Sequence, residues 1–135
     1  MARLSLILLA AAAVSAPAEV LEMAPTEQVA RGEYLALHVA KCVECHSPHD
    51  REGNLEETKL FSGQAMPFQS PFPSGPKWAF RSPALKGLPG WSVEEFVHIL
   101  TTGRRTNGRR ANSPMPQFRF SRQDAAAIAA YLQSY

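Results

Sequence analysis

The alternation of apolar and polar residues in the last third of the chain predicts two amphipathic helices. Apolar residues recur from Val93 at i, i+3, i+4 and i+7, and Ser92 with Glu95 forms a capping box just before this stripe. Gly103 marks the end of this helix. A second helix is expected to begin at Ser121, and its apolar positions repeat the same spacing: Ala125, Ile128, Ala129 and Leu132.

A third helix is predicted nearer the N-terminus, from about Thr26 to a cysteine motif at Cys42–His46. Thr26 follows Pro25 and is a suitable N-cap residue. One face of this helix carries small or apolar residues at i, i+3, i+7 and i+10: Gly32, Leu35, Val39 and Cys42. We therefore expect the first cysteine to project from the apolar face.

Residues 47–91 show no regular periodicity and contain seven of the eleven prolines. A loop of this length inside a compact domain is uncommon. It becomes reasonable if a large apolar cofactor acts as the core and the chain wraps around it. Aromatic side chains would supply the wrapping surface or ordinary core packing: Phe61, Phe68, Phe72, Trp78, Phe80 and Trp91. We expect one short helix or turn somewhere within this segment.

Residues 1–18 have the organisation of an export signal. Arg3 gives a positive start, an apolar stretch runs over residues 4–14, and small residues at 14–18 resemble a cleavage site. The apolar stretch is shorter than the roughly 20 residues that span a membrane. We expect cleavage to leave a domain at residues 19–135 in a bacterial periplasm. An uncleaved N-terminal anchor is the alternative.

Composition indicates one globular domain, because the chain has 135 residues of which 45% are apolar. The formal net charge of +2 conceals an uneven distribution. Residues 19–58 hold three Lys or Arg and nine Asp or Glu, whereas residues 59–135 hold ten Lys or Arg and three Asp or Glu. Such a dipole can steer the approach of a partner. The basic half does not combine a helix or strand pattern with aromatics, so nucleic-acid binding is not expected.

The chemistry of the chain concentrates at Cys42–His46, which reads C-V-E-C-H. This pattern is the attachment signature of a c-type haem. The two thiols lie about one helical turn apart, so both can add to the vinyl groups of one porphyrin. The imidazole of His46 can then bind the iron. We therefore expect one covalent haem c attached through Cys42 and Cys45.

Other uses of two cysteines are less well supported by the sequence. A disulfide is common in an oxidising compartment, but a redox C-x-x-C motif normally accompanies a βαβ pattern, which is not seen here. A zinc site needs further ligands at short spacing. The remaining histidines are scattered along the chain: His38, His49 and His98.

Met115 is the preferred candidate for the second axial ligand of the iron. It stands between Pro114 and Pro116, which fix φ on both flanks and stiffen the loop. A thioether adds no charge and raises the reduction potential relative to a second imidazole. Met66, before Pro67, is the rival that local sequence does not exclude. A second histidine as ligand is the further alternative, from His38, His49 or His98.

Two Gly-Arg-Arg triplets, at residues 103–105 and 108–110, precede Met115. Their guanidinium groups can pair with haem propionates or form a positive docking surface. Solvated loop charge is the simpler interpretation for any one of these arginines.

Taken together, residues 26–135 resemble the class I c-type cytochromes. The resemblance is carried by these segments: R-G-E-Y-L at 31–35, C-V-E-C-H at 42–46, G-W-S at 90–92, T-G-R-R at 102–105, P-M-P at 114–116 and A-A-I-A-A-Y-L at 126–132. From Ser82 onward the chain looks like the domains of mono- and dihaem subunits of periplasmic dehydrogenases. It departs from them at residues 82–86, where S-P-A-L-K replaces the frequent S-P-N-I-T, so any polar contact of that Asn is absent or replaced.

The resemblance implies an all-α fold, with three main helices and long loops wrapped around one covalent haem. It implies that Cys42 and Cys45 bind the porphyrin and that His46 and Met115 bind the iron. The resemblance thereby favours Met115 over Met66 as the second ligand. The first and last helices should cross, with Gly32 allowing close approach to an aromatic such as Tyr131.

The implied function is electron transfer without catalysis, with redox proteins as partners: a dehydrogenase as donor and an oxidase or another cytochrome as acceptor. A membrane would be a partner only if the N-terminal segment is retained. Two alternatives remain open. The chain could be a subunit of a larger dehydrogenase or oxidase complex, or a haem protein whose labile distal site binds small ligands.

Overall fold

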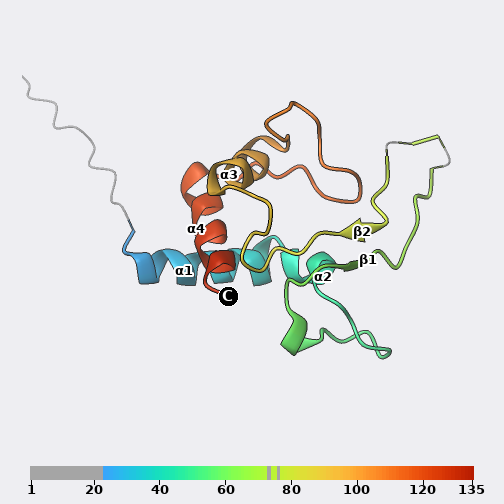
Figure 1. The fold of residues 1–135 in the computed structure, drawn as a ribbon, viewed down its shortest axis with the longest axis horizontal. Helices are drawn as coiled ribbons and strands as arrows, with labels where there is room; N and C mark the ends of the chain where they lie inside the picture. The colour runs from blue at the N-terminus through green and yellow to red at the C-terminus, as the bar shows by residue number, and fades with distance from the viewer. Residues whose placement is uncertain (1–22, 73, 76) are drawn as a thin grey trace, which may run out of the picture.

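The computed structural model describes residues 23–72, 74–75 and 77–135, so the predicted signal at residues 1–18 lies outside the described residues. Helices α1, α2, α3 and α4 and the short strands β1 and β2 are arranged as Figure 1 shows. Their bounds are Pro25–Tyr34 for α1, Cys42–His46 for α2, Gln64–Ala65 for β1, Arg81–Ser82 for β2, Val93–Thr102 for α3 and Arg122–Gln133 for α4. Within the described part of the chain, no helix combines the length and apolar character that a membrane span requires.

The central feature of the fold is the crossing of α1 and α4, with α3 packed beside α4 (Figure 1). Gly32 lies at the crossing point. A Cβ atom at this position would overlap the carbonyl oxygen of Ala127 and lie 2.8 Å from the Cβ of Tyr131. Arg31 Nε donates a hydrogen bond of 3.0 Å to Asp124 Oδ1 at the same crossing. The predicted contact between the first and last helices near Gly32 and Tyr131 is confirmed.

The capping residues predicted for the two C-terminal helices are also confirmed. At α3, the Glu95 amide donates to Ser92 Oγ at 3.2 Å, and the Ser92 amide donates to Glu95 Oε2 at 3.0 Å. Gly103 ends α3 with φ of 68°. At α4, the Asp124 amide donates to Ser121 Oγ at 3.0 Å.

The predicted apolar stripes of these helices face the core with one exception. On α4 the whole stripe is buried, as are three of the four stripe positions on α3: Ala125, Ile128, Ala129 and Leu132, with Phe96, Val97 and Leu100. Val93, at the first turn of α3, is 37% exposed. Val93 is the first residue of α3 and lies at the edge of the buried core.

The prediction of one continuous helix from an N-cap at Thr26 to the cysteine motif is wrong. Helix α1 begins at Pro25, after Ala24, which makes no side-chain cap. A π-helical turn follows at Leu35–Val39, in which the Ala40 amide donates to the Leu35 carbonyl at 2.8 Å. Lys41 then adopts φ of 53° before α2 begins.

The π-helical turn explains why the predicted apolar face is broken. A π turn adds one residue to the helical repeat and therefore rotates the residues within it. Val39 is 51% exposed as a result, whereas Gly32, Leu35 and Cys42 are buried as expected. The first cysteine thus still faces the interior.

The expectation of an all-α chain is also corrected in one detail, although the fold is mostly helical. Residues Gln64 and Ala65 pair antiparallel with Ser82 and Arg81. The Met66 amide extends the pairing by donating to the Phe80 carbonyl at 2.9 Å. The segment that joins the two strands extends away from the helices (Figure 1). A single helical turn at Glu57–Lys59 matches the short turn expected within residues 47–91.

Replacement of Gly32 tests the helix crossing. Ala normally stabilises an exposed helix relative to Gly by about 1 kcal/mol. At Gly32 the added methyl group would overlap the Ala127 carbonyl, so we expect Gly32→Ala to lower the free energy of unfolding by about 1–3 kcal/mol. Urea unfolding followed by circular dichroism measures the change, with Glu33→Ala at the exposed neighbouring position as the control. An unchanged or more stable Gly32→Ala protein would contradict the close crossing.

Candidate haem site

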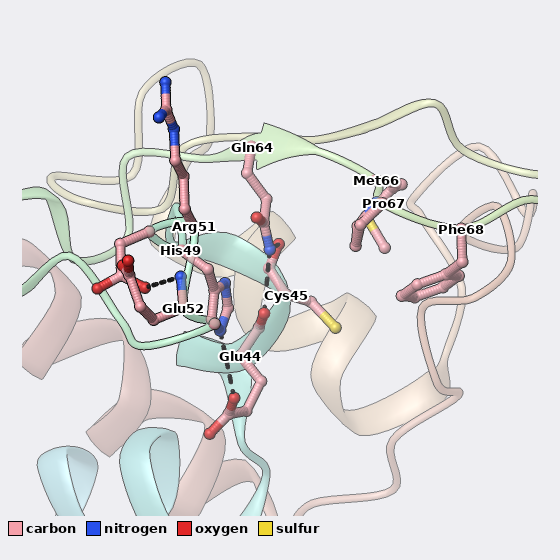
Figure 2. Close-up of a pocket in the computed structure, with 11 residues that line it drawn as sticks. Glu44, Cys45, His49, Arg51, Glu52, Gln64, Met66, Pro67 and Phe68 are labelled. Atoms are coloured by element: carbon pink, nitrogen blue, oxygen red, sulfur yellow. Dashed lines mark hydrogen bonds and ion pairs between the residues drawn. The ribbon is translucent and has the colours of Figure 1, made fainter.

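The two cysteines belong to α2, which begins immediately after the left-handed Lys41. Cys42 is buried and Cys45 is partly exposed. Figure 2 shows the Cys45 sulfur pointing toward the side of a cavity where Met66 and Phe68 lie. This cavity has a volume of about 570 Å³ and is lined by two stretches of chain, at residues 44–53 and 64–68. The second thiol of the motif therefore opens onto space beside apolar side chains.

The environment of the thiols disfavours thiolate chemistry. Both cysteines are free, and burial raises the pKa of Cys42 to about 11. Burial also raises the pKa of Cys45, with a smaller contribution from the negative charge of Glu44. A dithiol that exchanges disulfides needs a lowered thiol pKa. The pair therefore does not have the character of a redox-active dithiol.

A zinc site is likewise not formed around these cysteines. In the ranges that the structure describes, no three His, Cys, Asp or Glu side chains gather in a way that could hold a metal ion. His38 is exposed, His49 lies 3.6 Å from Glu44 Oε2, and His98 is half-buried on α3.

His46 is oriented through one ring nitrogen, and no hydrogen bond to the other is present among the described residues. The side chain is buried, and its Nδ1 lies 2.8 Å from the carbonyl oxygen of Pro83. Because a carbonyl can only accept, Nδ1 carries the hydrogen and donates it. Burial lowers the pKa of His46 despite the opposing effect of this hydrogen bond. The imidazole is therefore neutral and its Nε2 lone pair is available, which is the state that an iron ligand requires.

The segment that carries the Pro83 carbonyl is fixed by its own backbone contacts. The amides of Leu85 and Lys86 donate to the Phe61 carbonyl at 2.8 and 3.1 Å. Ser82 Oγ accepts from the Gln64 amide at 3.0 Å. This is the segment that departs from the usual S-P-N-I-T pattern. Here the orienting contact to His46 comes from a backbone carbonyl and does not need an Asn side chain.

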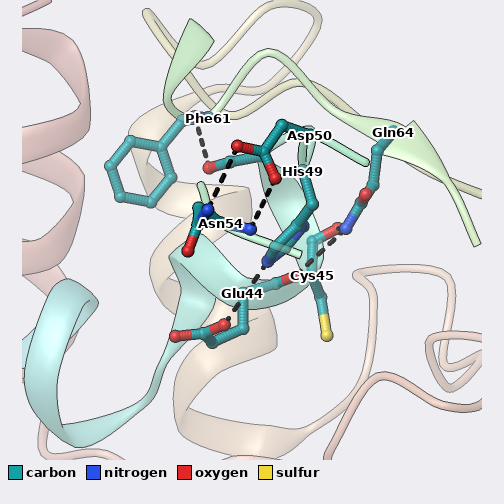
Figure 3. A network of polar contacts seen from close by, with 8 residues as sticks. Glu44, Cys45, His49, Asp50, Asn54, Phe61 and Gln64 are labelled. Carbon is teal, nitrogen blue, oxygen red and sulfur yellow. Dashed lines mark hydrogen bonds and ion pairs between the residues drawn. The ribbon is translucent and has the colours of Figure 1, made fainter. Parts of the chain in front are cut away.

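Figure 3 shows the polar contacts that hold the end of α2 and the loop after it. Gln64 Nε2 donates to the carbonyls of Glu44 and Cys45 at 3.0 and 3.3 Å, which satisfies groups left free at a helix C-terminus. Asp50 Oδ1 accepts from the amide of Asn54 at 2.8 Å and closes the following turn. The cysteine-bearing turn is therefore held by β1 rather than by the helix alone.

Ser47 connects the haem motif to the buried core. Its hydroxyl oxygen accepts from the Phe61 amide at 2.9 Å, and both residues are fully buried. Phe61 in turn meets Tyr131 of α4 edge to face, with ring centroids 5.9 Å apart. The roles of Ser47, Gln64 and the Pro83 carbonyl could not be predicted from the sequence. Each acts through a contact with a residue distant in the chain.

Met115 and Met66 lie on two segments that flank residues 77–80. The Ala79 amide donates to the Ser113 carbonyl at 2.7 Å, and the Ser113 amide donates to the Lys77 carbonyl at 3.1 Å. On the other side, Met66 pairs with Phe80. Both methionine side chains are half-buried, and Met66 lines the cavity beside Cys45. The structure thus ties both candidate methionines to one shared segment.

Trp78, on that shared segment, carries a buried hydrogen-bond donor without an acceptor. Its Nε1 has no partner among the described residues, and its ring meets Phe68 edge to face at 6.2 Å. A buried donor left unpaired costs about 1–3 kcal/mol, so such groups are rare. A haem carries propionate carboxylates, which are strong acceptors. An indole with this unmet need therefore fits the cofactor that the cysteine motif implies, whereas sequence reasoning treated Trp78 only as a wrapping aromatic.

The arginines of the two Gly-Arg-Arg triplets lie on one exposed loop. The Arg105 amide donates to the Arg109 carbonyl at 2.8 Å, and Arg104 Nη1 donates to the Gly108 carbonyl at 2.9 Å. The Arg105 guanidinium lies 5.3 Å from the ring centroid of Trp91. In the described residues none of the four arginines forms an ion pair.

Comparison with known proteins agrees with this geometry. The family model described as Cytochrome c matches residues 29–135, a range that includes the C-V-E-C-H motif, the Pro83 segment and Met115. Among curated proteins, none is similar enough in sequence to be counted as a relative. Members of the family bind haem c covalently and transfer electrons. Since the match covers most of its length, the chain belongs to the cytochrome c family.

Proposed function

We propose that the protein is a monohaem, class I, periplasmic electron carrier whose iron is bound by His46 and Met115, and that it catalyses no reaction of its own. The observation that carries this proposal is the state of His46, which is buried, neutral and oriented by Pro83 directly after the two cysteines. A bound haem supplies the one-electron couple of its iron. The chain's own residues hold, orient and shield that group.

The proposed role of His46 depends on its hydrogen bond to Pro83. A histidine ligand whose second nitrogen donates to a carbonyl keeps one tautomer and one ring orientation. The Pro83 carbonyl is itself part of the rigid segment held by Phe61. A ligand that does not reorient when the iron changes charge limits the structural rearrangement that accompanies electron transfer.

Met115 is the proposed second ligand for reasons of loop rigidity as well as family resemblance. Pro114 and Pro116 restrict its backbone. The hydrogen bonds of Ser113 to residues 77–79 anchor the loop. Met66 lines the cavity beside Cys45 and is the competing candidate for this ligand. The methionine variants described below distinguish the two. A thioether would favour the ferrous state more than a second imidazole does.

Exclusion of water is the remaining task of the chain. Trp78 and Phe68 pack against each other beside the cavity. Phe61 packs on Tyr131 of α4 and bonds to Ser47, the residue after the motif. We assign these side chains to the apolar enclosure of the haem, with the Trp78 indole as donor to a propionate. The export signal expected at residues 1–18 supports maturation in the periplasm, where the covalent attachment would take place.

The covalent attachment is tested by replacing both cysteines. We expect the exported wild-type protein to gain the mass of one haem and to stain for haem on a denaturing gel. Cys42→Ala/Cys45→Ala removes both thioether bonds, so neither signal should survive denaturation. Intact-protein mass spectrometry decides the outcome. Wild-type protein from a host that matures c-type cytochromes, isolated with its cysteines in a disulfide and without haem, would contradict the proposal.

The axial ligand is tested by a matched pair of methionine variants. We expect Met115→Ala to abolish the methionine–iron charge-transfer band of the ferric protein and to lower its reduction potential. Met66→Ala should retain the band, because its sulfur is not on the iron. Optical spectra and redox titration of both variants measure this. Loss of the band in Met66→Ala alone would transfer the role to Met66, and a high-spin wild-type spectrum would favour a labile distal site.

The role of Trp78 is tested through the pH dependence of the reduction potential. A donor to a propionate stabilises the ionised form and lowers its pKa. Hydrogen bonds to charged groups contribute about 1.5–3 kcal/mol, so Trp78→Phe should move the propionate transition upward by about one to two pH units. Trp91→Phe is the matched control, because it removes the other tryptophan of the chain. An identical pH profile in the wild type and Trp78→Phe would rule out the contact.

A further inference from the structure

Gly63, the residue before β1, lies against both partners of the hydrogen bond between His46 and Pro83. Its amide donates to the backbone carbonyl of His46 at 2.8 Å. A Cβ atom at this position would lie 2.9 Å from the carbonyl carbon of Pro83, the group whose oxygen accepts from His46 Nδ1. It would also lie 2.7 Å from the Ser82 carbonyl oxygen and 2.8 Å from the Ala84 nitrogen. One glycine therefore separates the backbone of the histidine from the segment that orients its ring.

The atoms that face Gly63 cannot turn aside as a flexible side chain would, because all of them belong to the backbone. Their segment is held in place by the amides of Leu85 and Lys86, which donate to the Phe61 carbonyl. Gly63 also has φ of 77°, a conformation that residues with a side chain rarely adopt. An added methyl group in such tight packing forces the backbone to shift. A side chain at this position would therefore displace the Pro83 carbonyl.

Ser47 fixes the other end of the same short stretch of chain. Its hydroxyl oxygen accepts from the amide of Phe61 at 2.9 Å, and both side chains are fully buried. Phe61 has φ of 58°, which is unusual for a residue with a side chain. The hydrogen bond from its amide holds Phe61 in this conformation. The Phe61 carbonyl is thereby directed at the two amides that it binds on the Pro83 segment.

Residues 61–63 thus form a short link between the two partners of the hydrogen bond. On one side the link bonds to Ser47 and to the His46 carbonyl, and on the other side it contacts residues 82–86. It leads into β1, which lies beside α2 (Figure 1). The distance from His46 Nδ1 to the Pro83 oxygen is 2.8 Å, and N–H···O bonds are most often about 2.9 Å long. Since the bond is near its optimum, a displacement of the carbonyl weakens it.

We infer that Gly63 and Ser47 are positioning residues for the iron ligand, because through residues 61–63 they hold the Pro83 carbonyl where it sets the electron donation of His46 and hence the reduction potential. This inference rests on the proposed function, since it requires His46 to bind the iron. Neither residue is assigned a contact with the haem. Both act through the hydrogen bond between His46 and Pro83.

The physical link between this hydrogen bond and the reduction potential is the basicity of the imidazole. A carbonyl that accepts from Nδ1–H makes the ring a stronger electron donor through Nε2. A stronger donor favours the ferric state, which carries the higher positive charge. Any change that weakens the hydrogen bond therefore favours the ferrous state and raises the reduction potential. A residue that served only the stability of the fold would leave the potential unchanged.

Redox titration of the holoprotein tests the role of Gly63. We expect Gly63→Ala to raise the equilibrium constant for reduction of the ferric protein about threefold or more, which corresponds to about 28 mV for one electron. Gly90→Ala is the matched control, because Gly90 has a similar φ of 75° and a Cβ atom there would meet nothing within 4 Å. The control carries the backbone strain without the collision and should keep the wild-type potential. An unchanged or lowered potential in Gly63→Ala, or an equal rise in Gly90→Ala, would overturn the inference.

Ser47→Ala tests the same link without straining a glycine, and it decides the question if Gly63→Ala does not fold. Loss of the hydroxyl releases the Phe61 amide, so the potential should again rise. Ser121→Ala is its control, since Ser121 Oγ also accepts from a backbone amide, that of Asp124 at the start of α4. This variant loses a helix cap and stability but should keep the wild-type potential. A rise that is equal in the two serine variants would refute the positioning role.

Proton NMR of the ferrous holoprotein, labelled with ¹⁵N-histidine, reports on the hydrogen bond itself. We expect the Nδ1 proton of His46 to move to lower chemical shift and to exchange faster with solvent in Gly63→Ala and Ser47→Ala. Both control variants should resemble the wild type. A shifted potential with an unchanged Nδ1 proton would show that the substitutions act by another route, and would also overturn the inference.

The wild-type holoprotein separates failure of this inference from failure of the proposed function. Dithionite should reduce it and ferricyanide should oxidise it again. A holoprotein that cycles with these reagents, but whose potential and Nδ1 proton ignore both substitutions, refutes only the positioning role. A wild-type protein that does not cycle, or that matures without haem, refutes the proposed function as well.

Discussion

The hydrogen bond from His46 Nδ1 to the Pro83 carbonyl, 2.8 Å long, joins the short cysteine-bearing helix to the irregular middle of the chain. Both ends of this bond are held by the backbone of Phe61. Pro83 stands in a segment held by the Phe61 carbonyl, and Ser47 next to His46 accepts from the Phe61 amide. Phe61 itself packs on Tyr131, and so the position of the imidazole depends on the crossing of α1 and α4. Phe61 thus links the helices to the site, in addition to the packing of Cys42 and Val43 in the same buried core.

A covalent cofactor explains why so much irregular chain surrounds so few helices. The side chains of α4 form much of the buried core, whereas three phenylalanines described on the segment between β1 and β2 are exposed: Phe68, Phe72 and Phe80. The cavity beside Cys45 and the unpaired Trp78 donor lie on this side of the molecule. A haem attached at Cys42 and Cys45 would supply both the missing apolar surface and the missing acceptor. The group that would transfer electrons would thus also complete the packing of this part of the chain.

Local patterns were the reliable part of the sequence. The capping box of α3 and the stripe of α4 depend on residues close in sequence, and the structure contains them. The helix crossing at Gly32, which the structure also contains, was implied by the family resemblance and not by a local pattern. The π-helical turn, the β1–β2 pair and the Pro83 carbonyl were not predicted. They arise from long-range backbone contacts, for which a side-chain pattern carries no signal. Trp78 was predicted from the sequence to be one of the aromatic residues around the haem. That its buried indole nitrogen has no acceptor among the described residues could be seen only in the structure.

A crystal structure of the haem-loaded protein would show directly which residues bind the iron. We expect iron between His46 Nε2 and Met115 Sδ, with His46 Nδ1 still donating to the Pro83 carbonyl. We also expect the Trp78 indole within hydrogen-bond distance of a propionate. An iron bound by Met66, or a His46 ring turned away from Pro83, would contradict the account.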